Sequence, residues 1–231
     1  MIDFHTHILP GMDDGSRDCA QTLAMLREMA RQGVDTAVAT PHFYRRENTP
    51  AAFLERRARS YALLRPHLTP ELPRLLLGAE AAFFPGMAQA EDTALLCIEN
   101  TRTLLVEMPC RPWGRAVPAE LTALAARFIV VLAHVERFWF LQSPATRRFL
   151  LEGPCRLQVN AGGLCLWPTR VLELPYLRRG AVTVIGSDCH GTLYRPPCAG
   201  RAYGVLAQKL GPEKVQALQA GMAALLEPAD K

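Results

Sequence analysis

The stretch Asp3-Phe4-His5-Thr6-His7 combines the end of an apolar segment with two imidazoles placed two residues apart. Ile2–Phe4 predicts a short buried strand. In an extended chain the side chains of residues i and i+2 point to the same side, so His5 and His7 can reach one metal ion. Imidazole is a common ligand of zinc, iron and related ions. A single H-x-H pattern is weak evidence for a metal site. The evidence becomes stronger if other potential ligands lie at the ends of the other predicted strands.

Segments typical of strands and of helices alternate along the whole chain. The predicted strands are Ile2–Phe4, Thr36–Ala39, Leu75–Glu80, Thr103–Glu107, Phe128–Ala133, Cys155–Asn160 and Val182–Ser187. The predicted helices are Asp18–Arg31, Ala51–Leu64, Pro118–Arg127, Thr146–Leu151, Val171–Arg179, Gly200–Leu210 and Pro212–Leu226. The first helix has the clearest pattern: Leu23, Leu26 and Ala30 recur at helical spacing, Asp18 suits the N-cap, and Gly33 suits the end.

Short apolar strands that alternate with helices predict an α/β fold, in which a parallel sheet is covered by helices. Seven such units favour a closed or nearly closed barrel, with an open doubly wound sheet as the alternative. No Gly/Ser linker, repeat or low-complexity tract divides the chain. We therefore expect a single domain over residues 1–231.

Residues able to bind metal follow or end six of the predicted strands. They are His5, His7, His42, Glu80, Glu107, His134, Asp188 and His190. In a barrel of this kind the reactive groups collect at the carboxyl ends of the strands, where Asn160 can add a polar contact. Each residue has an ordinary structural explanation when taken singly, and Asp13 and Asp14 lie in a turn-like composition. Together, however, so many imidazoles and carboxylates need neutralisation. Two or three divalent ions would provide it.

Composition excludes several classes of function. The net charge of +4 is mild, and no run of Lys and Arg with interleaved aromatic residues indicates nucleic-acid binding. No apolar run approaches the roughly 20 residues of a membrane span, so we expect no membrane insertion, and no secretory signal is visible. The seven cysteines are scattered and form no C-x-x-C, which favours reduced thiols in the cytoplasm.

The same residues carry a resemblance to a known family. The chain resembles the PHP (polymerase and histidinol phosphatase) superfamily, and more narrowly the bacterial PHP-type protein-tyrosine phosphatases associated with capsule and exopolysaccharide synthesis. The matching segments appear in family order: Asp3–Pro10 with Asp13–Gly15, Thr40–His42, Gly78–Glu80, Val106–Glu107, Ala133–Arg137, Val159–Ala161, Ser187–His190 and Arg195–Pro197.

The resemblance implies a distorted (β/α)₇ barrel of the PHP type, with the metal site at the C-terminal ends of the strands. By motif, the first ion would be held by His5, His7, Glu80 and Asp188. The second would be held by Glu80, Glu107 and His134, and the third by Asp14, His42 and His190. Arg137 and Arg195 would face the substrate phosphate, and Asp14 would belong to the catalytic group. Manganese, iron and zinc all suit such ligands, and manganese is favoured.

The implied activity is that of a metal-dependent protein-tyrosine phosphatase, in which a metal-held hydroxide attacks phosphorus without a phosphoenzyme. The expected partner is a phosphotyrosine protein, namely the tail of a bacterial tyrosine kinase. Alternatives are a phosphatase for a small metabolite such as histidinol phosphate, and a metal-binding regulatory protein without turnover. A thiol mechanism through Cys189-x₅-Arg195 is disfavoured, because Pro196 and Pro197 fit poorly with the helix it requires. The oligomeric state and the roles of Arg45 and Arg46 stay open.

Overall fold

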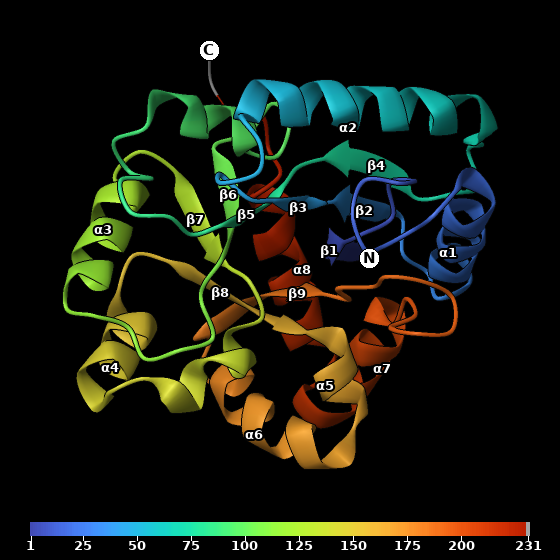
Figure 1. The fold of residues 1–231 in the computed structure, drawn as a ribbon. Helices are drawn as coiled ribbons and strands as arrows, with labels where there is room; N and C mark the ends of the chain where they lie inside the picture. The colour runs from blue at the N-terminus through green and yellow to red at the C-terminus, as the bar shows by residue number, and fades with distance from the viewer. Residues whose placement is uncertain (230–231) are drawn as a thin grey trace.

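The computed structural model describes residues 1–229, in which parallel strands lie inside a ring of helices (Figure 1). The strands are β1 (Ile2–Thr6), β2 (Thr36–Ala39), β3 (His42–Phe43), β4 (Arg74–Leu77), β5 (Glu80–Ala82), β6 (Thr103–Glu107), β7 (Ile129–Leu132), β8 (Arg156–Asn160) and β9 (Val182–Gly186). One sheet has the order β1-β2-β4 and the other the order β3-β5-β6-β7-β8-β9, and every pair of strands is parallel. The predicted α/β fold with a parallel sheet is therefore confirmed.

Helices follow most of the strands and cover their outer face. The α-helices are α1 (Cys19–Arg31), α2 (Pro50–Leu64), α3 (Ala116–Ala125), α4 (Pro144–Glu152), α5 (Ala161–Cys165), α6 (Trp167–Arg178), α7 (Ala199–Leu210) and α8 (Pro212–Ala224). Short 3₁₀ helices lie at Arg65–His67, Glu91–Leu96, Val135–Arg137 and Trp139–Leu141. Each predicted helix overlaps an observed one, whereas the short helix α5 was not predicted.

Helix α1 begins and ends where its sequence signals predict. Asp18 is the N-cap, and its Oδ1 accepts a hydrogen bond of 2.8 Å from the backbone N–H of Gln21. Gly33 has a φ of +79°, which a glycine after a helix adopts without strain. Its buried face contains Met25, Leu26 and Met29, whereas Leu23 and Ala30 are only half-buried.

The predicted strand Leu75–Glu80 is interrupted between β4 and β5, and β3 is a further strand after Thr36–Ala39, so the described residues form nine strands rather than seven. Thr40 and Pro41 separate β2 from β3, and proline cannot donate to a ladder. Backbone hydrogen bonds nevertheless cross the interruption, since Gly78 N donates to Ala39 O at 2.8 Å and Glu80 N donates to Pro41 O at 3.0 Å. The prediction that Leu75–Glu80 is one strand ending at Glu80 is therefore wrong, whereas His42 follows β2 as predicted and also opens β3.

The interruptions place two candidate ligands side by side. His42 opens β3 and Glu80 opens β5, and these two residues are register partners in the parallel ladder. Register partners on neighbouring strands point to the same face of the sheet. The start of β3 beside the start of β5 therefore brings an imidazole and a carboxylate together.

Strand β1 connects the two sheets. Asp188 N, just after β9, donates to His5 O at 2.8 Å, and His7 N donates to Cys189 O at 3.0 Å. The approach is close, because a Cβ added to Gly186 would lie 2.4 Å from the Cβ of His5. Only glycine fits at this position, so the end of β9 and His5 hold each other in place.

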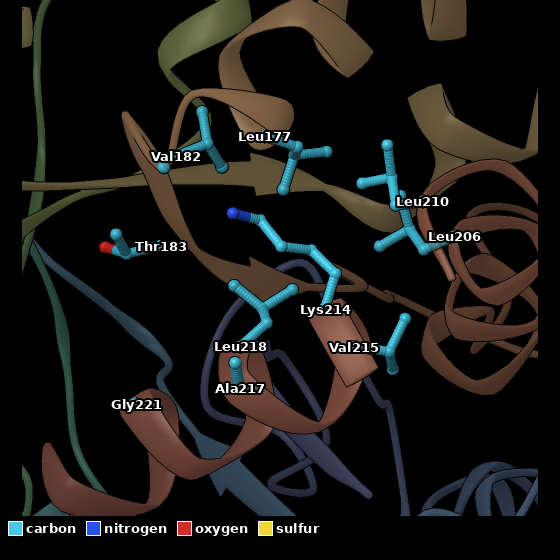
Figure 2. A pocket seen from close by; sticks show the side chains of 11 residues that line it. Leu177, Val182, Thr183, Leu206, Leu210, Lys214, Val215, Ala217, Leu218 and Gly221 are labelled. Carbon is cyan, nitrogen blue, oxygen red and sulfur yellow. The ribbon is translucent and has the colours of Figure 1, made fainter. Parts of the chain in front are cut away.

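An apolar pocket of about 200 Å³ lies at the opposite end of the strands from the candidate ligands (Figure 2). It is formed where α6, α7 and α8 pack around the first residues of β9, and Leu177, Leu206 and Leu218 form much of its wall. The side chain of Lys214 reaches across it. Among residues 1–229, no helix is both long enough and apolar enough to cross a bilayer.

Candidate metal centre

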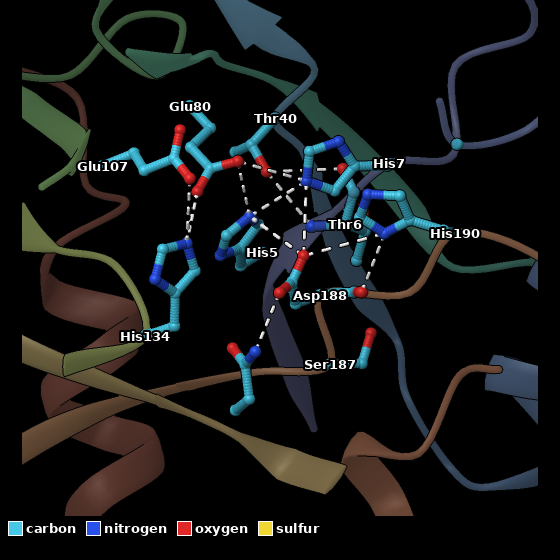
Figure 3. Close-up of polar contacts among 12 residues, drawn as sticks. His5, Thr6, His7, Thr40, Glu80, Glu107, His134, Ser187, Asp188 and His190 are labelled. Atoms are coloured by element: carbon cyan, nitrogen blue, oxygen red, sulfur yellow. Dashed lines mark hydrogen bonds and ion pairs between the residues drawn. The ribbon is translucent and has the colours of Figure 1, made fainter. Parts of the chain in front are cut away.

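The predicted metal ligands lie in one cluster, most of which Figure 3 shows, and His42 and Asp14 join it through contacts with Glu80 and His190. Most of their side chains are buried, and the exceptions are His42, Glu107 and Asp14, whose side chains are 16%, 23% and 68% exposed. The cluster therefore consists of a buried interior and one edge that opens to solvent at Asp14.

The first group consists of His5, His7, Glu80 and Asp188. The Nε2 atoms of the two histidines are 3.1 Å apart, and each lies 3.3 Å from Glu80 Oε2. Asp188 Oδ1 lies 3.6 Å from His5 Nε2 and 3.4 Å from His7 Nε2. Ligand atoms bound about 2.1 Å from one ion are themselves roughly 3.0–3.4 Å apart. The spacing of these four atoms therefore suits a shared cation.

The outer nitrogen of each histidine is held by a hydrogen-bond acceptor. His7 Nδ1 lies 2.7 Å from Asp13 Oδ2, and His5 Nδ1 lies 3.2 Å from Gln158 Oε1. Because both partners accept, each Nδ1 donates to its partner, and each Nε2 points toward the centre of the cluster. Histidines that bind metals are oriented by such contacts in many metalloproteins.

The second group is built around Glu80. Its Oε1 lies 2.8 Å from His134 Nε2, and its Oε2 lies 2.9 Å from His42 Nδ1. Glu107 approaches the same two imidazoles at 3.7 and 3.9 Å. Within residues 1–229, Glu80 Oε2 and His42 Nδ1 are buried and have no properly oriented hydrogen-bond partner. Unpaired buried polar atoms are costly, and a divalent cation among them would remove the cost. The residues present therefore fit metal binding.

The third group consists of Asp14, His42 and His190, with His7 beside them. Asp14 Oδ1 lies 3.3 Å from His190 Nε2 and 3.6 Å from His42 Nε2. The rings of His7 and His190 are stacked with their centroids 4.0 Å apart. His42 thus belongs to two groups, one through each ring nitrogen, whereas the motif assignment gave it only to the third.

Arg137 and Arg195 converge on one oxygen of the cluster. Arg137 Nη2 donates to Asp188 Oδ2 at 2.6 Å, Arg195 forms an ion pair with the same oxygen, and Asn160 Nδ2 donates to it at 2.8 Å. Arg195 Nη1 also lies 3.2 Å from His190 Nε2. Both guanidinium groups therefore lie beside the candidate ligands, where a bound anion could contact the arginines and the metals together.

Three residues of the centre have unusual backbone conformations. His134, Asp188 and Arg195 have φ angles of 33°, 52° and 49°. Non-glycine residues rarely adopt positive φ, and each instance costs on the order of 1–3 kcal/mol unless the surroundings hold it. They do so here: Gln158 Oε1 accepts from His134 N at 2.8 Å, and His5 O accepts from Asp188 N. Such strain is typical of functional sites.

The charges of the cluster stabilise one another. Burial alone would raise the pKa of Glu80, but the charge of His5 and the close contacts with His134 and His42 hold it well below its usual range. Burial would likewise lower the pKa of His7, but its hydrogen bonds with Asp13, Asp188 and Glu80 raise it well above the usual value. The Glu80 carboxylate therefore stays ionised, which is the form that binds a metal.

Cys189 lies between two candidate ligands but is completely buried. Burial, together with the negative charge of Asp3, raises the pKa of its thiol well above the usual range. A nucleophilic cysteine needs an accessible thiolate. The alternative thiol mechanism is therefore disfavoured, and Arg195 contacts Asp188 instead of forming a cradle around this sulfur.

Three polar residues of the centre have roles that were not predicted. Asp13 orients His7 and also accepts from His42 N at 2.9 Å. Gln158 contacts both His5 and His134, and Asp3 Oδ1 accepts from Ser187 N at 2.7 Å. Gln158 offered a usable signal, because it is a polar residue inside the apolar strand β8 and lies on the same face as Asn160.

The fold and the cluster define a parallel α/β protein with a candidate multinuclear metal centre at the carboxyl ends of its strands. The family model described as "Capsular polysaccharide synthesis, CpsB/CapC" matches residues 1–226. The chain belongs to the CpsB/CapC family.

Characterised relatives extend along almost the whole chain. The chain is 28% identical to the tyrosine-protein phosphatase CpsB of Streptococcus pneumoniae over 232 residues, covering 94% of each protein. It is 29% identical to the tyrosine-protein phosphatase YwqE of Bacillus subtilis over 222 residues, covering 92% of this chain and 86% of YwqE. A crystal structure from work on YwqE and CpsB, described as unique metal-dependent tyrosine phosphatases, matches with a TM-score of 0.81 at 26% identity and covers 100% of both chains.

Proposed function

We propose that this protein is a metal-dependent phosphatase that hydrolyses phosphotyrosine on proteins. The observation that carries the proposal is the cluster itself, in which His5, His7, Glu80 and Asp188 surround a space of the right size for a cation while two arginines contact Asp188. Membership of the CpsB/CapC family and the relatives that are named tyrosine-protein phosphatases support the same activity.

We assign the first ion to His5, His7, Glu80 and Asp188, the second to Glu80, Glu107 and His134, and the third to Asp14, His42 and His190. Divalent ions at these positions, with manganese favoured over iron or zinc, would supply Lewis acidity and an activated water. Asp14 lies at the exposed edge, where it closes the third site on the side from which substrate enters.

The protein's own groups would act on the phosphoryl oxygens. The planar guanidinium groups of Arg137 and Arg195 bind two oxygens at once and stabilise the charge that spreads over them in the transition state. Asp188 orients both arginines through one oxygen. A phenolate leaves more readily than an alkoxide, so tyrosine esters need little help from a general acid.

The remaining assignments rest on the family. We propose that residues 1–231 form one PHP phosphatase domain, a distorted (β/α)₇ barrel that β1 nearly closes through its contacts with β2 and β9. The proposed substrate is the tyrosine-rich tail of a bacterial tyrosine kinase that controls capsule or exopolysaccharide synthesis. All seven cysteines are free thiols, which supports a location in the cytoplasm.

Turnover of matched substrates tests the proposal. A phosphotyrosine peptide, a phosphoserine peptide and histidinol phosphate should be compared by kcat/KM, with Mn²⁺ added and after removal of metal by a chelator. We expect the phosphotyrosine peptide to be preferred, activity to vanish with the metal, and Mn²⁺ to restore it. Full activity without metal would overturn the metal assignment. A tenfold preference for histidinol phosphate would make the protein a metabolite phosphatase.

A further inference from the structure

A groove of about 430 Å³ opens next to the metal centre and has no role in the chemistry described above. We call it the rim groove and define it by Tyr44, Arg46, Phe83, Phe84, Arg111 and Trp113. It lies beyond the ends of β3, β5 and β6, which are the strands that carry His42, Glu80 and Glu107. The groove therefore continues from the second metal group toward solvent.

Two contacts join the rim groove to the centre. The ring of Tyr44 is stacked on the ring of His42, with centroids 5.3 Å apart and an angle of 26° between the planes. Tyr44 also lines the smaller hollow that contains Asp14. On the other side, Phe83 N donates to Glu107 O at 2.9 Å. These contacts make the rim groove one path by which a chain whose phosphate lay at the metals would leave the centre.

The far wall of the groove is already ordered. The backbone N–H of Trp113 donates to Gln142 Oε1 at 3.1 Å, and its indole Nε1 donates to Pro109 O at 3.2 Å. Its ring packs against Phe138 at a centroid distance of 4.9 Å. A preformed wall lowers the entropic cost of binding, because its side chains are already ordered. Its aromatic rings offer apolar contact to a peptide backbone or a tyrosine ring.

The charge of the groove is positive and partly unpaired. Arg45 is neutralised, because it forms an ion pair with Asp92 at 2.5 Å and lies over the ring of Phe84. Within residues 1–229, neither Arg46 nor Arg111 forms an ion pair, and both are exposed. Glu47 is the one acidic residue among those lining the groove.

We infer that the rim groove binds the segment flanking the phosphotyrosine of a substrate protein, and that Arg46 and Arg111 select acidic residues in that segment. The inference rests on the proposed function and adds a substrate class to it. A small phosphate ester would not reach these arginines, so substituting them would change the hydrolysis of peptides only. Charge pairs at such exposed positions act mainly on selectivity and on the rate of encounter.

Charge reversal tests the inference. Two phosphotyrosine peptides of equal length should be compared, one with glutamates on both sides of the phosphotyrosine and one with lysines. The readout is the ratio of their kcat/KM values, with p-nitrophenyl phosphate measured in parallel to correct for any general loss of activity. We expect the wild-type protein to prefer the acidic peptide about tenfold, as two exposed charge pairs allow, and the Arg46→Glu/Arg111→Glu protein to prefer the lysine peptide.

Arg178→Glu is the matched control, because this exposed arginine ends α6 near the opposite ends of the strands and should leave the ratio unchanged. Raising the salt from about 50 mM to about 500 mM should reduce the wild-type preference, since exposed charges are screened. An unchanged ratio in the double variant would overturn the inference while leaving the proposed function intact. If the wild-type protein hydrolyses p-nitrophenyl phosphate but neither peptide, the proposed function and the inference fail together.

Discussion

At the scale of single residues, the contact between Arg137 and Asp188 makes Arg137 the arginine whose substitution best tests phosphate binding. Arg137→Ala should lower kcat/KM for a phosphotyrosine peptide at least tenfold, or about 1.4 kcal/mol of transition-state stabilisation. Arg137→Lys should recover only part of this, because an ammonium group cannot make a two-pronged contact. Steady-state kinetics with the metal content measured in each protein would separate substrate binding from loss of metal. Unchanged kinetics in the alanine variant would place Arg137 outside the site.

Asp13 illustrates a residue that acts through another. Its carboxylate holds Nδ1 of His7, and these contacts keep its pKa at about 2 in spite of burial. Asp13→Ala should weaken metal binding about 10–100-fold, as the loss of such orienting groups does in other metal sites. Calorimetric titration with Mn²⁺ measures this directly.

Asp18→Ala provides the comparison for Asp13→Ala. Asp18 is a nearby carboxylate that caps α1 and contacts no candidate ligand. Its loss should cost about 1 kcal/mol of folding free energy and leave metal affinity unchanged. Equal metal affinity in the two variants would show that Asp13 has only a structural role.

At the scale of secondary-structure elements, the approach of β9 to β1 predicts opposite effects for two glycine substitutions. Gly186→Ala would force a Cβ to within 2.4 Å of the Cβ of His5, so we expect a lower Tm and weaker metal binding. Gly204 lies in α7 with nothing within 4 Å of an added Cβ, so Gly204→Ala should raise stability by about 0.5–1 kcal/mol. Thermal unfolding of both variants tests these expectations. A fall in Tm for Gly204→Ala would contradict them.

The elements predicted best are those whose signals are local. Thr36–Ala39 and Thr103–Glu107 were predicted with the observed bounds, because each is one apolar run that is buried as a unit. Helix α5 contains Gly162 and Gly163, which are poor helix formers, and it is held by contacts with α6 and α7 that local sequence cannot reveal. The contacts of Asp13 with His42 and of Gln158 with His5 were missed for the same reason, since each joins residues far apart in the sequence.

At the scale of the whole molecule, a buried carboxyl group outside the metal centre couples stability to pH. Glu173 in α6 is buried, and Oε2 has no hydrogen-bond partner among the described residues. Burial, followed by the negative charges of Glu136 and Cys165, raises its pKa to about 8. Because its pKa in the unfolded chain is about 4.3, the folded state binds the proton more tightly. Its contribution to stability is therefore complete below about pH 4 and is lost as the pH rises through about 8.

Glu173→Gln should remove this dependence. An amide resembles the protonated acid, so the Tm difference between variant and wild type should be small at about pH 5 and should grow in favour of the variant toward about pH 8.5. Differential scanning calorimetry at matched metal content measures the difference. A Tm difference that stays constant over this range would mean that Glu173 is not protonated in the folded protein.

The candidate ligands are spread from His5 in β1 to His190 after β9, and β1 completes its contacts with the chain through residues 188 and 189. During synthesis the first histidines therefore leave the ribosome long before their partners exist. A nascent or prematurely terminated chain has two imidazoles but no closed ligand set. Hydrolytic capacity would accordingly arise abruptly, once residues 188–190 have joined the first histidines, rather than gradually as the polypeptide lengthens.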